Sequence, residues 1–509
     1  MTMTETWVLS APLLLPFATA VAALLVPRPE LNARWVSLGG SALHLVATVA
    51  LATMIWQQGP MAASFGGWQA PLGIALVADT LSAVMVLVTA LMGLVCATYA
   101  IADVGKRRAR RHWHALYQVL LAGATGAFLT GDLFNLYVWF EVMLIASFGL
   151  LVMGGSRAEL DGGVKYVALN LVATIMFLTA IGLIHAITGT LTMADLPARL
   201  IGADPAAVAG ASMLLFGAFA AKAGLFPLFF WLPAAYHTPP MAVTAIFAGI
   251  LTKAGVYALM RVFTLVFPEG PAMDVLLVIA VLTMVVGVIG AAAQTDVHRI
   301  LSFHIVSQIG YMALGIALGS ALALLGAILY MVHNIVVKAN LFLIAGVGRR
   351  LTGSHRLGRG AGLYAAAPFL TVLFLLAAMA MAGVPPFSGF WGKLALVQAG
   401  AAEEHWLAIA ATLGVGLFTL YSMTKIWLRG YLAEPERGRA RHLTALPGPA
   451  RVALLTPIVA LTAVSLSMGL APEPYLAVAE RAAAELLAPQ PYIDAVLGLP
   501  PTFTEGGPR

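Results

Sequence analysis

Apolar runs of about 18 to 25 residues repeat along this chain, and each is long enough for a helix to cross ~30 Å of hydrocarbon. Only 10% of the 509 residues are charged and 61% are hydrophobic, whereas roughly a quarter of a soluble chain is charged. This composition excludes a water-soluble enzyme. No strands of about 10 alternating residues, typical of a transmembrane barrel, are visible. The sequence therefore predicts an all-α polytopic membrane protein.

The runs predict fourteen transmembrane spans. We place them at 9–26, 35–56, 77–101, 115–131, 134–154, 164–187, 211–233, 240–267, 274–293, 299–319, 321–347, 366–400, 405–428 and 452–470. The first run follows an acidic start without Lys or Arg, which favours a retained helix over a cleaved signal peptide. The run 366–400 is too long for one crossing and contains Pro385–Pro386, so we predict one discontinuous helix there.

The 28 Lys and Arg residues are distributed unevenly between the two sides of these spans. Twenty of them fall in the loops 27–34, 102–114, 155–165, 294–299, 348–365 and 425–451. By the positive-inside rule these loops are cytoplasmic and both termini lie outside. We assign Arg261 to the opposite, poorly charged side. The basic run Lys106–Arg111 sits between two spans, which favours a role in topology and lipid contact over nucleic-acid binding.

Four lysines and one glutamate remain inside the spans: Lys222, Lys253, Lys338, Lys393 and Glu141. A charge at the bilayer centre costs at least ~2.5 kcal/mol, so these residues require a purpose. A buried lysine can exchange a proton near neutral pH, whereas arginine stays charged. The restriction to lysine therefore indicates proton handling.

An internal repeat joins the two halves of the chain. The stretches Ala221–Pro227 and Ala380–Pro386 both read A-x-A-G-x-x-P, and Tyr166–Asn170 resembles Tyr330–Asn334 upstream. The repeated unit holds five spans, and an odd number gives two copies of opposite orientation, each with one Pro-interrupted helix. Inverted repeats place functional sites near the midplane. The predicted segments are an N-terminal three-helix segment (1–114), repeats 115–267 and 274–428, and a C-terminal helix and tail (429–509).

The intramembrane charges suggest a proton path. A carboxylate near a buried lysine favours its charged form and releases the proton when it moves away, so Glu141 and Lys222 could act as a switch; a static ion pair between two helices is the alternative. Lys253 follows in the next span. His333 and Lys338 share a later one, offset by roughly 140° around the helix. Lys393 lies just past the second proline break.

Other candidate sites are not supported by the sequence. The single cysteine, Cys96, excludes a disulfide framework and a cysteine-built metal site. We find no phosphate-binding glycine loop, metal-spaced histidine cluster or nucleophile elbow, so no cofactor and no metal are expected. His44 is interpreted as an interior hydrogen-bonded residue, His304 as a residue near a span end, and His114 as a member of a solvated basic loop.

Three stretches resemble a known family. They are Gly131–Ile145, which contains Glu141; Ala221–Pro227 with Trp231–Pro233 and His237–Pro240 after it; and Gly383–Lys393. Together they resemble the antiporter-like subunits shared by respiratory complex I and Mrp-type cation/proton antiporters, and most closely the D-subunit branch. The resemblance covers roughly residues 5 to 500.

The resemblance implies roles for the intramembrane residues. It implies that Glu141 and Lys222 form a modulating pair, that Lys253 and His333 are relays, and that Lys393 ends the path. The assignment of Lys338 to this path rests mainly on its position inside a span. The implied function is a proton-translocating subunit of a multisubunit Na⁺(K⁺)/H⁺ antiporter in the bacterial cytoplasmic membrane. Its expected partners are other hydrophobic subunits, H⁺ with Na⁺ or K⁺, and lipid.

Three other functions remain open at this point. The chain could be a redox-driven proton-pumping subunit of complex I or of a membrane-bound hydrogenase. It could be a scaffold whose charges only hold helices together, or a solute carrier that works alone. In the antiporter interpretation the chain is a secondary transporter subunit and not an enzyme.

Overall fold

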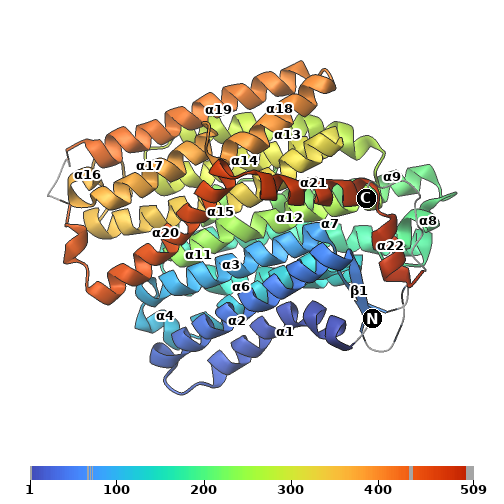
Figure 1. The fold of residues 1–509 in the computed structure, drawn as a ribbon, viewed down its shortest axis with the longest axis horizontal. Coiled ribbons are helices and arrows are strands. Elements are labelled where there is room, and N and C mark those ends of the chain that lie inside the picture. Colours follow the sequence, from blue (N-terminus) through green and yellow to red (C-terminus); the bar gives the residue numbers. More distant parts are fainter. Residues whose placement is uncertain (1–2, 66–67, 69, 71–72, 435–439, 500–509) are drawn as a thin grey trace.

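The computed structural model describes residues 3–65, 68, 70, 73–434 and 440–499, and most of these residues are helical. Long helices run side by side along one direction (Figure 1). Twelve of the described helices are long and apolar enough to cross a membrane. The chain is therefore a multi-pass helical membrane protein, as its sequence predicts.

The N-terminal segment contains three long helices and a small hairpin. Its elements are α1 (Met3–Leu25), α2 (Pro29–Gln58), β1 (Met61–Ser64), β2 (Ala75–Ala78), α3 (Thr80–Asp103) and α4 (Lys106–Arg110). The strands pair antiparallel, with Met61 opposite Ala78. The third predicted span starts too early, because residues 77 and 78 belong to β2. Helix α3 begins after Asp79, whose carboxylate accepts a hydrogen bond from the backbone N–H of Ser82 at 2.9 Å.

The middle of the chain forms the next group of helices. They are α5 (Trp113–Leu129), α6 (Leu133–Val152), α7 (Arg157–Thr188), α8 (Leu196–Leu200), α9 (Pro205–Ala223), α10 (Trp231–Ala235), α11 (Met241–Ile246), the π-helix η1 (Phe247–Leu251) and α12 (Thr252–Leu265). Elements α11, η1 and α12 form one continuous crossing. Helix α6 begins where Asp132 caps the N–H of Asn135 at 2.8 Å.

The remaining helices complete the bundle. They are α13 (Pro271–Ala293), α14 (Val297–Leu318), α15 (Ala321–Thr352), α16 (Leu363–Ala366), α17 (Pro368–Ala382), α18 (Ser388–Ala402), α19 (Trp406–Ile426), the π-helix η2 (Trp427–Leu432), the 3₁₀ turn η3 (Leu443–Ala445), α20 (Gly448–Leu470), α21 (Glu473–Leu487) and α22 (Gln490–Leu497). Helix α21 packs across α15 and α3, and α22 contacts the β1–β2 hairpin (Figure 1).

Two predicted spans form helices that are shorter than the twelve long crossings. Helix α5 has 17 residues, and the run 366–400 is divided between α17 and α18, which have 15 residues each. The break between α17 and α18 is the interruption that Pro385–Pro386 predicts. The count of fourteen spans, the segment boundaries and the inverted arrangement of the repeats remain predictions.

The two repeat motifs form the same local break. Helix α9 ends at Gly224 with φ 80° and ψ 39°, and helix α17 ends at Gly383 with φ 82° and ψ 32°. This left-handed conformation suits glycine, because a side chain there is strained. The alanine-glycine motif therefore stops a membrane helix at corresponding places in both halves.

Three crossings form the centre of the bundle. The most apolar windows of Met241–Leu265, α14 and α15 are 94%, 89% and 78% buried, whereas those of α1, α2 and α19 are 33–44% buried. The central crossings carry Lys253, His333 and Lys338. Buried charges are therefore placed where protein, and not lipid, surrounds them.

Some sequence assignments change in the structure. Arg261 is not in an outer loop; it lies in α12, buried, with its guanidinium 2.6 Å from the Asp79 carboxylate. His114 is buried in α5 and not in a solvated loop, because α5 begins at Trp113. His304 is fully buried in α14. Two cations assigned to the cytoplasmic side, Arg437 and Arg439, lie outside the described residues.

Candidate functional site

Glu141, on α6, and Lys222, on α9, contact each other next to α7. Lys222 Nζ lies 3.5 Å from Glu141 Oε1. Thr174, on α7 between them, donates to Glu141 Oε1 at 2.6 Å and accepts from Lys222 Nζ at 3.2 Å. The hydroxyl therefore links the ammonium and the carboxylate in one network.

The two charges of this pair have different surroundings. The Lys222 side chain is 6% exposed and its Nζ lies 5.5 Å from the Phe140 ring centroid, whereas the Glu141 side chain is 24% exposed. The carboxylate thus lies at the edge of the chain and the ammonium points inward. A molecule outside this chain can therefore contact the Glu141 carboxylate without touching Lys222.

Lys253 lies just after the π-helical turn η1. Its side chain is fully buried, and its Nζ donates to the carbonyl of Ala248 at 2.7 Å. A π-turn departs from the regular i to i+4 ladder, which makes a carbonyl within the helix available to the ammonium. Such turns often occur at functional sites.

Helix α12 approaches the end of α9 very closely near Lys253. A Cβ added at Gly255 would lie 2.5 Å from the backbone N of Ala223 and 2.8 Å from the carbonyl carbon of Lys222. Only glycine allows this contact, which brings the backbones of Lys222 and Lys253 into neighbouring positions. No direct hydrogen bond joins these two side chains within the described residues.

His333 and Lys393 form the second group, on α15 and α18. The His333 Nδ1 is 2.8 Å from Ser388 Oγ, which lies 2.9 Å from Ser465 Oγ on α20. Lys393 Nζ donates to the carbonyl of Ala382 at 2.9 Å. That carbonyl is the last of α17, so the helix break supplies an acceptor for the buried ammonium.

Lys338 lies between these groups. Its side chain is fully buried on α15, and its Nζ has no hydrogen-bond partner among residues that the structure describes. It interacts electrostatically with both Lys253 and Lys393, and His333 interacts with Lys338 and Lys393. The structure therefore brings Lys253, Lys338, His333 and Lys393 into one electrostatically connected cluster, with Glu141 and Lys222 beside it.

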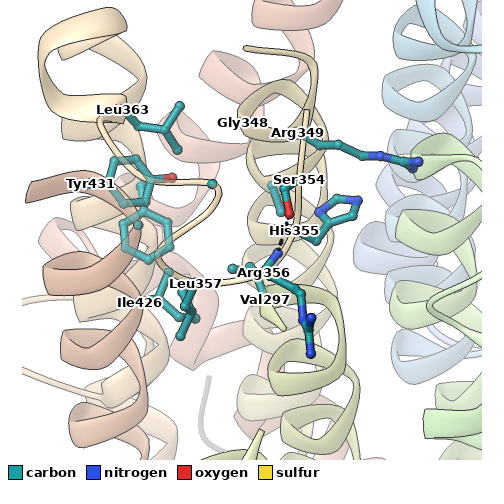
Figure 2. Close-up of a pocket in the computed structure, with 14 residues that line it drawn as sticks. Val297, Gly348, Arg349, Ser354, His355, Arg356, Leu357, Leu363, Ile426 and Tyr431 are labelled. Atoms are coloured by element: carbon teal, nitrogen blue, oxygen red, sulfur yellow. Dashed lines mark hydrogen bonds between the residues drawn. The ribbon is translucent and has the colours of Figure 1, made fainter. Parts of the chain in front are cut away.

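A separate pocket lies at the end of the bundle that carries many basic residues. Figure 2 shows it between the loop 354–357, the end of α15 and the π-helix η2. Its volume is about 30 Å³, and none of the predicted path residues lines it. The His355 ring there lies 3.5 Å from the His298 ring, centroid to centroid. Burial and the nearby Arg349 charge lower the pKa of His355 to about 4.

Several residues around the site cannot be identified as site residues from the sequence. Thr174 and Ser388 are ordinary hydroxyls in apolar runs, and only the fold places them against Glu141 and His333. His304 is a fully buried imidazole whose two ring nitrogens have no partner in the described structure. Arg261 could have been recognised, because it lies within the predicted span 240–267.

The chain is similar to known proteins over nearly its whole length. Residues 130–419 match the family described as "NADH:quinone oxidoreductase/Mrp antiporter, TM". The chain is 42% identical to the D subunit of the Na(+)/H(+) antiporter of Alkalihalophilus pseudofirmus, covering 96% of this chain and 98% of the relative. It is 37% identical to the corresponding D subunit of Bacillus subtilis, again covering 96% and 98%.

A solved structure has the same fold. A chain of the Mrp complex from Dietzia sp. DQ12-45-1b matches with a TM-score of 0.90 and 33% identity, covering 98% of this chain and 100% of that chain.

Proposed function

This chain belongs to the NADH:quinone oxidoreductase/Mrp antiporter family, and from that premise we propose that it is a proton-translocating subunit of a multisubunit monovalent cation/proton antiporter. In this function the chain moves protons and works with other hydrophobic membrane subunits. The names and the full-length match of the D-subunit relatives and the Mrp complex support this function over a redox-driven pump.

The observation that carries the mechanism is the Thr174-bridged contact of Glu141 and Lys222. At an effective dielectric near 20, unit charges about 4 Å apart attract by about 4 kcal/mol. With the carboxylate ionised and near, Lys222 holds its proton. When the carboxylate is neutralised or withdrawn, the buried ammonium loses this support and gives the proton up.

The proton then passes through the buried cluster. Lys253 follows Lys222 across the close contact at Gly255, and Lys338 lies within electrostatic reach of both Lys253 and Lys393. His333 carries protons beside Lys338, because a neutral imidazole accepts at one nitrogen and donates from the other. Lys393, at the second helix break, ends the path. A charge arriving at one lysine repels the next, so each proton movement favours release further along.

The uneven distribution of Lys and Arg between the two ends of the bundle supports an orientation of the chain in the membrane. Helices α4 and α16, which lie in or next to the basic loops, are at one end of the bundle, and α22 and the start of α1 are at the other (Figure 1). We assign the basic end to the cytoplasm and both termini to the outer side of the bacterial cytoplasmic membrane.

The test uses the complete antiporter complex in proteoliposomes, with a fluorescent reporter of internal pH and pulses of Na⁺ or K⁺. Lys222→Ala is expected to abolish cation-driven proton exchange while the partner subunits still copurify. Wild-type exchange by an assembled Lys222→Ala complex would refute the mechanism.

Lys222→Arg separates a proton switch from a static ion pair. Arginine keeps the charge and the contact with Glu141 but does not release its proton. We expect the Arg variant to be as inactive as the Ala variant. Full activity in the Arg variant would support the static pair instead.

A further inference from the structure

Two sets of polar residues lie near Lys338 and Lys393, on different faces of α15. The first contains His333, whose ring contacts Ser388 on α18. The second follows the contact between α14 and α15, where Tyr330, Asn334 and Lys338 are spaced by four residues and so share one face. His333 is offset from Lys338 by roughly 140° around the helix.

The facing side of α14 is equally polar. His304, Gln308 and Tyr311 follow each other at spacings of four and three, so they also form one stripe. The Tyr330 hydroxyl donates to Gln308 Oε1, and the rings of Tyr311 and Tyr330 lie 5.1 Å apart. The two polar stripes therefore meet along the seam between these antiparallel helices.

Contacts on either side fix where His304 lies in this seam. Toward one end Tyr311 lies beside Tyr330, and toward the other the His298 ring lies 5.9 Å from the Phe342 ring. This register sets His304 opposite the turn of α15 that runs from Asn334 to Lys338. His304 also interacts electrostatically with both Lys338 and Lys393.

Several buried polar atoms in this part of the seam have no hydrogen-bond partner among the described residues. Both ring nitrogens of His304, both amide atoms of Asn334 and the Lys338 ammonium are buried with no hydrogen bond to any described residue. A buried polar atom without a hydrogen bond is energetically unfavourable. Five such atoms on two facing helices indicate a hydrated seam and not dry helix packing.

The seam also reaches the end of the path. Lys393 Nζ lies 5.0 Å from the Tyr311 ring centroid and 5.9 Å from that of Tyr330. The set formed by His304, Asn334, Gln308 and Tyr330 thus lies near the same two lysines as His333.

We propose that His304 is a second proton-relay residue that works in parallel with His333, so that protons pass around both faces of α15 between Lys338 and Lys393. This inference rests on the proposed function. Neutral His304 takes a proton from the Lys338 ammonium through water at one ring nitrogen and releases the proton of the other nitrogen through water to neutral Lys393, while Gln308 and Tyr330 hydrogen-bond the water between them without carrying the proton. Lys338 is left neutral and ready for the next proton from Lys253.

The test compares His304→Gln, His333→Gln and the double variant in the complete complex, with Na⁺- or K⁺-driven proton exchange measured in proteoliposomes. Glutamine keeps hydrogen bonds but does not relay protons. If the routes are parallel, each single variant keeps most of the wild-type rate because the other route remains, and the double variant loses about a hundredfold or more, which is the scale of losing a positioned proton carrier.

A matched control shows whether the loss is specific. His44→Gln places the same substitution at another fully buried histidine, on α2, away from the seam. It should leave exchange at the wild-type rate. Copurified partner subunits and the thermal unfolding temperature should be unchanged in all four variants, because a merely structural role of His304 would lower that temperature.

Three outcomes would overturn the inference. A His333→Gln variant as inactive as the double variant would place all flow on one route. A His304→Gln variant as inactive as the double would put the histidines in series. A double variant that keeps the wild-type rate would remove both histidines from the path. If wild-type complex shows no cation-driven exchange, it is the proposed function that fails.

Discussion

Lys222 is closer to Thr174 than to Glu141: its Nζ lies 3.2 Å from the threonine hydroxyl and 3.5 Å from the carboxylate. The hydroxyl donates its own hydrogen to the carboxylate at 2.6 Å. An ion pair joined through a hydroxyl has a weaker direct contact than a fully closed one, so a small movement of the Glu141 side chain can break it.

Removing this bridge should slow exchange without abolishing it. Thr174→Val keeps the shape of the side chain and deletes the hydroxyl, so Glu141 and Lys222 retain only their 3.5 Å contact. We expect a several-fold lower exchange rate in proteoliposomes with normal assembly, and Thr174→Ser should restore most of it. An unchanged rate in Thr174→Val would show that the bridge does not matter.

A larger side chain at the contact between α9 and α12 should lower the stability of the folded protein. Gly255→Ala places a Cβ 2.5 Å from the Ala223 nitrogen, and relief requires the helices to separate, at a cost of about 1–3 kcal/mol. Thermal unfolding of the purified complex should begin at a lower temperature. Gly210→Ala is the control, because nothing lies within 4 Å of its new Cβ. Equal stability of both variants would contradict the close approach.

The pair Asp79 and Arg261 should stabilise the junction of α3 and α12. Both side chains are nearly fully buried, 2.6 Å apart, and breaking a buried pair costs about 3–5 kcal/mol. Asp79→Asn alone should therefore lower the unfolding temperature strongly. Combining it with Arg261→Gln should recover part of the loss, because no uncompensated charge then remains. A double variant less stable than the sum of both single variants would argue against this pairing.

Acid should weaken the region around His355. Because burial and Arg349 hold the pKa of His355 at about 4, below its ordinary 6.5, the folded protein keeps this ring neutral. This contribution to stability is complete above pH 6.5 and decreases as the pH falls toward 4. In that range His355 binds a proton in the unfolded chain but stays neutral in the folded protein. His355→Phe should flatten the dependence of unfolding temperature on pH in that range.

The exposed His442 provides the comparison for this prediction. His442→Phe should leave the pH dependence as in the wild-type protein. The same slope in the His355 and His442 variants would exclude His355 as the source.

The orientation can be checked with single cysteines. Cys96 is fully buried, so a cysteine introduced at an exposed site should provide the main labelling signal. In intact cells, an impermeant maleimide should label Thr4→Cys and Gln490→Cys but not Arg107→Cys, which should react only after permeabilisation. The reverse pattern would invert the proposed topology.

The class of protein, the two helix breaks and the short list of intramembrane charges can all be predicted from the amino-acid sequence. These follow from local rules, because run length decides membrane crossing, glycine permits a left-handed helix end, and a lysine in an apolar run is visible as an exception. Arg261 was misplaced because an arginine near a span end can belong to a loop or to the helix. The burial of His114 and His304 is not visible in the sequence, because it depends on helix packing and not on the neighbouring residues along the chain.

The contacts between side chains, by contrast, depend on how the helices pack. Thr174 and Ser388 are two among many hydroxyls until α7 and α18 bring them to Glu141 and His333. His304 gains significance only when α14 and α15 pack antiparallel at one register, opposite Lys338. Periodicity within a helix gives the direction of a side chain around its own axis, but the partner on that face depends on helix contacts between residues distant in the chain, and those are set by packing of the whole bundle.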